Sequence, residues 1–179
     1  MSQDNLHNFP VPSPDNAPAG PTGTQHQLSA EESALASSCP GEWFHIEVTY
    51  TDGGKAAKGY LSQYASGAMY WDSYIIITDT PQTKFKRVDS GAWESDVSQV
   101  TYKNPPFYLC VTAGPRYWVY LSNNYIDIKW WIANGKLYNS YANGAAGCVP
   151  QDPPFYSRQL WVCFNSGNDL YDCKIIPAC

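Results

Sequence analysis

The sequence is poor in the residue types that carry most enzyme and metal chemistry. Histidine occurs three times, and His45 is the one histidine outside the N-terminal 42 residues. No CxxC pair is present, so a zinc site built from Cys and His is not expected. Neither a GxSxG motif nor a Cys-His signature surrounds His45, which argues against the common hydrolytic triads. Carboxylate pairs could run glycoside hydrolysis, but they occur on any acidic domain. We therefore expect no metal, no cofactor and no catalysis.

Charged residues are also scarce. They make up 15% of the chain, and the formal net charge is −5. A nucleic-acid-binding protein should show a basic footprint, so no nucleic-acid partner is expected. Apolar runs such as residues 74–77 have the length of a strand, far below the roughly 18 residues that a membrane helix needs. We therefore expect no transmembrane segment.

Cysteine, in contrast, is frequent. The six cysteines are Cys39, Cys110, Cys148, Cys163, Cys173 and Cys179. An even number favours disulfides and an extracellular or other oxidising compartment, although residues 1–7 show no secretory signal. Buried reduced thiols in a cytosolic protein are the alternative. Many pairings are open, and we favour a Cys163–Cys173 disulfide because these residues flank the turn at residues 166–168.

The first 42 residues are predicted to form an extended arm. Residues 1–28 are rich in Pro, Gly, Ser, Asn and Gln, and such a segment buries too little apolar surface to offset its ordering entropy. Disorder is therefore expected there. Residues 29–32 form a capping box, which predicts one short helix near residues 29–37.

From residue 43 onward the pattern is typical of an all-β domain. Residues 44–50 alternate apolar and polar side chains, as a half-buried strand does. Asn134 and Gly135 lie between two apolar runs and predict a tight hairpin, because a type I′ turn needs two positive φ values. Further strands are expected at residues 60–64, 69–77, 84–88, 97–102, 108–112, 117–121, 126–132, 136–140, 159–164 and 170–175.

A short pattern occurs three times in this region: an aromatic residue on a strand, a glycine turn, and another apolar residue. Its copies are Phe85, Gly91 and Trp93; Trp131, Gly135 and Leu137; and Trp161, Gly167 and Leu170. Val-Thr-Tyr and Pro-Pro-Phe-Tyr also occur twice each. We infer a domain of three repeated units at about residues 43–98, 99–146 and 147–179. Chance similarity among Tyr-rich strands is the alternative.

These residues resemble a β-trefoil of the ricin-B lectin type, whose units carry Gln-x-Trp, a glycine turn and an apolar residue. Gln159 and Trp161 match the motif, whereas Lys129 stands in place of Gln before Trp131. The copy at Phe85 lacks both motif residues. The resemblance covers residues 43–179 and implies that Phe85, Trp131 and Trp161 pack together in a core.

The resemblance also implies a non-catalytic, lectin-like protein whose partners are glycans or glycoproteins. In that family a carboxylate, an aromatic platform and nearby Asn or Gln side chains bind the sugar, whose apolar face stacks on the ring. The carboxylate expected after a Cys-Leu stretch is displaced to Asp152 in the third unit and is missing in the second. The candidate ligand residues are Asp152, Tyr156, Asn139, Asn143, Asp72, Trp71 and Tyr70.

Two other functions are compatible with the sequence. A structural protein could self-assemble into a homo-oligomer through the N-terminal arm, with Cys39 or Cys179 cross-linking subunits. A protease inhibitor could instead present the rigid Pro-containing loops at residues 104–106 and 113–116, with Arg116 as the basic anchor.

Overall fold

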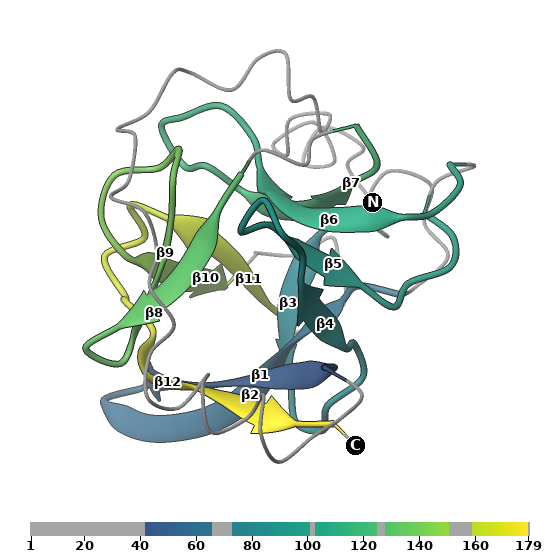
Figure 1. Ribbon diagram of the computed structural model, residues 1–179. Coiled ribbons are helices and arrows are strands. Elements are labelled where there is room, and N and C mark those ends of the chain that lie inside the picture. Colours follow the sequence, from purple (N-terminus) through teal and green to yellow (C-terminus); the bar gives the residue numbers. More distant parts are fainter. Residues whose placement is uncertain (1–41, 66–72, 101–102, 125–127, 151–158, 179) are drawn as a thin grey trace, which may run out of the picture.

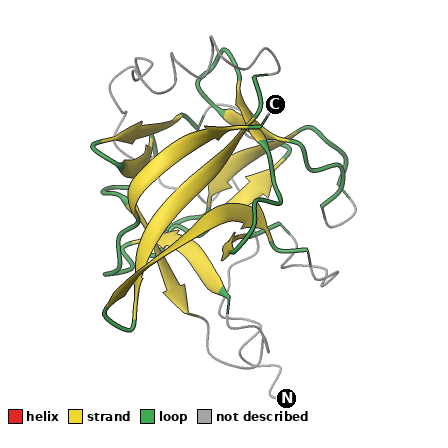
Figure 2. Cartoon of the chain, turned by 90° about the horizontal axis from the view of Figure 1, so that it is seen from below, coloured by secondary structure: helices red, strands yellow, loops and turns green. Residues whose placement is uncertain are grey.

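The computed structural model describes residues 42–65, 73–100, 103–124, 128–150 and 159–178. Within these ranges the chain is all-β and contains no helix (Figures 1 and 2). The twelve strands are β1 (Phe44–Asp52), β2 (Lys55–Gln63), β3 (Ile75–Thr78), β4 (Phe85–Arg87), β5 (Trp93–Ser95), β6 (Phe107–Val111), β7 (Val119–Ser122), β8 (Trp130–Ala133), β9 (Lys136–Asn139), β10 (Ala146–Pro150), β11 (Leu160–Phe164) and β12 (Tyr171–Pro177). The predicted short helix and almost all of the N-terminal arm lie outside the described residues.

Ten strands form one antiparallel sheet that curls strongly into a half-barrel (Figures 1 and 2). Their order is β10-β11-β3-β2-β1-β4-β5-β6-β7, and β12 pairs with β1. Strand β1 therefore pairs with β2, β4 and β12, and it brings the two ends of the described domain together. Strands β8 and β9 form a separate two-stranded sheet.

Three hairpins, β2–β3, β6–β7 and β10–β11, contact one another in pairs. Strand β11 pairs directly with β3. Isolated bridges join Tyr74, next to β3, to Tyr120 on β7, and Trp118, next to β7, to Cys163 on β11. These contacts hold the curled sheet together at points far apart in the sequence.

A chain of buried aromatic rings runs through the core. Phe44 on β1 meets Trp93 on β5 edge-on at 5.4 Å between ring centroids. Trp93 stacks with Trp130 on β8 at 6.3 Å, and Trp130 lies 6.2 Å from Phe164 on β11. Trp130 also donates a hydrogen bond from Nε1 to the Leu109 carbonyl at 2.8 Å. The separate hairpin is thus attached to the large sheet through the Trp130 side chain.

The core aromatics agree with the sequence prediction at two positions and differ at the third. Phe85 and Trp161 are fully buried, but Trp130 is buried in place of Trp131. The two-residue turn places Ile132 opposite Leu137, and this apolar pair faces the core. Because side chains alternate along a strand, Trp130 points to the same side and Trp131 points outward.

The strands also differ from expectation in three places. Strands β5 and β10 are absent from the sequence prediction, and residues 97–100 form no strand. Strand β5 has only three residues, and β10 contains Gly147, which weakens the β signal. Glycine is required at this position because a Cβ atom would overlap both Ser166 Oγ and the Asn168 backbone oxygen. Tertiary contacts, rather than local propensity, favour these two strands.

Replacing each tryptophan of the doublet tests this register. Trp130→Ala should lower the free energy of unfolding by about 3–5 kcal/mol, because it removes a fully buried indole. Trp131→Ala should cost less, about 1 kcal/mol, since its indole is half-buried on the outer face. Chemical denaturation of both variants measures the difference. Equal losses would show that the register is wrong.

Candidate functional site

A pair of aromatic side chains lies on the outer face of the β8–β9 hairpin. Trp131 and Tyr138 are direct cross-strand partners, with ring centroids 6.1 Å apart and ring planes only 19° from parallel. Both side chains are half-buried, so part of each ring faces solvent. We call this pair the aromatic platform. Tryptophan and tyrosine each combine an apolar ring with a polar group.

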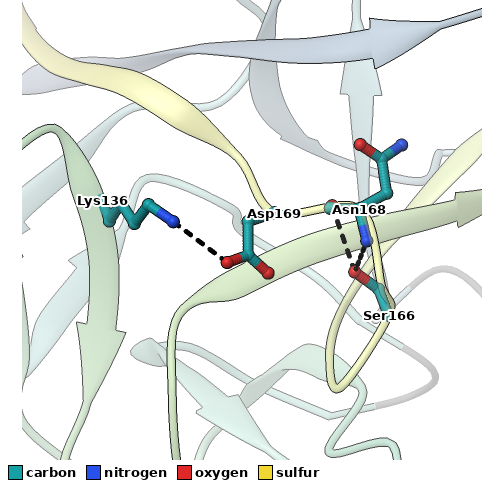
Figure 3. Close-up of polar contacts among 4 residues, drawn as sticks. All are labelled: Lys136, Ser166, Asn168 and Asp169. Carbon is teal, nitrogen blue, oxygen red and sulfur yellow. Dashed lines mark hydrogen bonds and ion pairs between the residues drawn. The ribbon is translucent and has the colours of Figure 1, made fainter.

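An ion pair lies beside the platform. Lys136 is two residues before Tyr138 on β9 and shares its face, and Lys136 Nζ lies 3.1 Å from Asp169 Oδ2 (Figure 3). The two side chains are 39% and 47% exposed. An exposed ion pair contributes only about 0–1 kcal/mol to stability. The partly exposed ammonium and carboxylate have hydrogen-bonding capacity beyond this one contact.

The loop that carries Asp169 is held by several hydrogen bonds. Ser166 Oγ accepts from the Asn168 backbone N–H at 3.0 Å and donates to the Asn168 carbonyl at 3.1 Å (Figure 3). Asn168 Nδ2 donates to the Thr51 carbonyl at 3.1 Å. Asp169 itself forms a backbone bridge with Gly147. The carboxylate is thus positioned before any ligand arrives.

The β8–β9 turn is fixed just as firmly. Asn134 and Gly135 have φ values of 52° and 74°, as a type I′ turn requires. The Gly135 carbonyl accepts a hydrogen bond from the Cys173 backbone N–H at 2.8 Å. A Cβ atom at Gly135 would lie 3.3 Å from the Asp172 backbone nitrogen, so the turn packs closely on β12. Lys136, which follows the turn, is thereby placed next to the loop of Asp169.

Two of the ligand residues predicted from sequence lie in the described part of the chain. Asn139 is buried, and its Oδ1 accepts hydrogen bonds from the backbone N–H groups of Tyr141 and Ala142 at 2.8 and 2.7 Å. It therefore stabilises the turn after β9 from the inner side of the hairpin. Asn143 is exposed on the following loop. The other five, Asp152, Tyr156, Asp72, Trp71 and Tyr70, lie outside the described residues.

The platform residues were missed in the sequence because Trp131 was assigned to the core. A signal for the correct register was nevertheless present. A two-residue turn at Asn134 and Gly135 places Ile132 opposite Leu137, and this apolar pair should face inward. Trp131 then faces outward beside Tyr138. Asp169 has no comparable signal, because it lies 33 residues from Lys136 in the sequence.

Cys163 and Cys173 are free thiols, so the predicted disulfide is not present. The prediction assumed that their strands form one hairpin, but β11 pairs with β10 and β3, whereas β12 pairs with β1. Burial raises the pKa of the Cys163 thiol to about 11, although the nearby Arg116 lowers it. Burial raises the pKa values of Cys110, Cys148 and Cys173 to about 12.

Arg116, the anchor of the inhibitor hypothesis, is bonded to the neighbouring loop. Its carbonyl accepts a hydrogen bond from the Phe164 N–H at 2.7 Å, and its Nη1 lies 3.4 Å from the Asn165 carbonyl. Asn165 Nδ2 in turn donates to the Pro115 carbonyl at 2.6 Å. A reactive-site residue must offer its own carbonyl to the oxyanion hole of a protease. These contacts weigh against Arg116 in that role.

Comparisons with known proteins do not identify a family. No protein-family model, no curated protein and no solved structure matches the chain. Over the described ranges, no helix is long and apolar enough to cross a membrane. The same residues contain no group of three or more His, Cys, Asp or Glu side chains that could hold a metal ion.

The four buried thiols should resist alkylation in the folded protein. At pH 8 a pKa of about 11 leaves roughly one Cys163 thiol in a thousand as the reactive thiolate. Peptide mass spectrometry after iodoacetamide treatment should find Cys110, Cys148, Cys163 and Cys173 unlabelled, and fully labelled once guanidinium unfolds the chain. A linked Cys163–Cys173 peptide in a non-reduced digest would contradict the structure.

Proposed function

We propose that this protein binds carbohydrate, without catalysing a reaction, through the aromatic platform of Trp131 and Tyr138. The observation that carries the proposal is the position of this ring pair beside the Lys136–Asp169 ion pair. A pyranose ring has an apolar C–H face that can stack on aromatic rings. Its hydroxyl groups need donors and acceptors, which an ammonium and a carboxylate supply.

The rigidity of the site also favours ligand binding. The inner side of the hairpin is fastened to the core by Trp130 and Leu137, which are fully buried. Asp169 lies on a loop that is hydrogen-bonded to the Thr51 carbonyl through Asn168. Ligand binding would therefore cost little conformational entropy in the protein, and this raises the affinity that a small contact area can reach.

We further propose that the half-barrel is a β-trefoil, as the sequence resemblance implied. Strand β1 pairs with both β4 and β12, so the first and last strands meet. The hairpins β2–β3, β6–β7 and β10–β11 contact one another in pairs, as three equivalent units around one axis would. An experimental structure tests this proposal, because three four-stranded units should then superpose about a common axis.

Glycan binding by surface variants tests the proposed function. A glycan array should find ligands for the wild-type protein, and calorimetry should show that Trp131→Ala or Tyr138→Ala weakens binding at least about tenfold, a loss near 1.4 kcal/mol. Asp169→Asn should weaken binding by a smaller factor, because a charged acceptor becomes neutral. Tyr60→Ala, which removes a half-buried aromatic from β2, serves as the matched control.

Two results would count against this site. If no glycan binds the folded wild-type protein, the carbohydrate function fails. If glycans bind but Trp131→Ala and Tyr138→Ala bind as well as Tyr60→Ala does, the ligand site lies elsewhere. Circular dichroism of each variant shows whether the fold is intact.

A further inference from the structure

A second lysine lies at the other end of the aromatic platform. Lys129 N–H donates to Ser140 Oγ at 3.0 Å, and Ser140 N–H donates to the Lys129 carbonyl at 3.0 Å. The pairing of β8 and β9 thus continues one residue beyond β8. Since side chains alternate along paired strands, Lys129 faces outward on the same side as Trp131.

The stem of Lys129 is held in place. A Cβ atom at Gly91 would lie 3.1 Å from Lys129 Cγ, so the lysine methylenes pack directly over this glycine. The Trp130 N–H also donates to the Gly91 carbonyl at 3.1 Å, which fixes the backbone beside it. A lysine whose stem lies along the protein surface keeps its ammonium in water. Lys129 is thus two residues before Trp131 on the outer face, with its methylenes over Gly91.

The two ends of the platform differ in charge. At one end the Lys136 ammonium is paired with Asp169 at 3.1 Å. At the other end Lys129 has no ion pair with any described residue, whereas Lys58 and Lys86 are paired with Glu47 and Glu94. Among the described residues, the platform thus has a neutral ion pair at one end and a lysine without an ion-pair partner at the other.

We propose that the ligand is a glycan whose sugar ring carries a carboxylate, and that Lys129 binds this carboxylate while the ring stacks on Trp131 and Tyr138. This inference rests on the proposed carbohydrate function. Lys129 and Trp131 are two residues apart, with Cα atoms about 6.7 Å from each other, and the ammonium beyond the stem that packs on Gly91 can turn toward a ligand on the rings. The Lys136–Asp169 pair then binds the hydroxyl groups.

The net charge of the chain does not oppose an acidic ligand. The value of −5 is a sum over all residues. Exposed charges more than about 8 Å apart are largely screened at physiological ionic strength, so binding responds mainly to the nearest charges. Within the described ranges, Lys129 is the lysine of this hairpin that has no ion pair, since Lys136 is paired with Asp169.

Matched ligand pairs that differ in the carboxylate test the proposal. One pair is an oligogalacturonate and its methyl ester, and the other is sialyllactose and lactose. Calorimetry should show that wild-type protein binds the carboxylated member of at least one pair about fivefold more tightly or better. The preference should shrink as salt is raised. The pair that shows it distinguishes a uronic acid from a sialic acid.

Substitutions of lysine assign the preference to one residue. Lys129→Gln should bind both members of the preferred pair with similar affinity, at about the level of the neutral sugar in wild type, and Lys129→Arg should retain most of the preference. Lys58→Gln removes the same charge from β2, where Lys58 is 69% exposed, and should leave the preference unchanged. Trp131→Ala should weaken binding of both members.

Each outcome decides between the two proposals. The carboxylate inference is overturned if both members of each pair bind equally or if the neutral sugar is preferred. In that case the platform remains the ligand site if Trp131→Ala still abolishes binding. A preference that survives in Lys129→Gln overturns the assignment of Lys129. Absence of binding to these four ligands overturns the inference, and absence across the glycan array as well overturns the carbohydrate function.

Discussion

An isolated two-stranded hairpin is marginally stable in water, so the β8–β9 hairpin depends on what holds its inner side. Trp130 provides this hold. Its indole is fully buried next to Trp93 and Phe164, and its Nε1 donates to the Leu109 carbonyl at 2.8 Å. Because neighbouring side chains on a strand point to opposite faces, fixing Trp130 inward turns Trp131 outward. Together with the buried Leu137 opposite Ile132, this hydrogen-bonded indole attaches the hairpin to the core and sets which face points outward.

The groups around the platform come from segments far apart in the chain, and backbone contacts bring them together. The Cys173 N–H bonds to the Gly135 carbonyl, and the loop before β12 is tied to β1 through Asn168 and Thr51. Lys136 and Asp169 can then meet at the surface without contributing much to stability. Such a pair can exchange its partners for those of a ligand at low cost to the fold. Rigid backbone and replaceable side-chain contacts are combined in one place.

The all-β class and the hairpin at Asn134 and Gly135 follow from the sequence, because alternation and turn chemistry are local properties. The register of the tryptophan doublet does not follow from local preference, since two adjacent tryptophans fit a strand equally well. Cross-strand pairing of Ile132 with Leu137 makes that choice. Strand β10 and the position of Asp169 depend on contacts of Gly147 with a distant loop, which no short sequence window contains.

The replacement of Gln by Lys129 before Trp131, which departs from the Gln-x-Trp pattern, has a structural explanation in the β8–β9 hairpin. Gln159 precedes a buried Trp161, whereas Lys129 precedes an outward-facing Trp131. The two triplets look alike in sequence but occupy opposite faces, because the second tryptophan of the doublet is displaced from the core by the first. Trp131 is as a result half-buried on the outer face beside Tyr138. Local disagreement with a structural pattern is where a functional position should be sought, and here it coincides with half-buried rings beside a lysine that has no ion pair among the described residues.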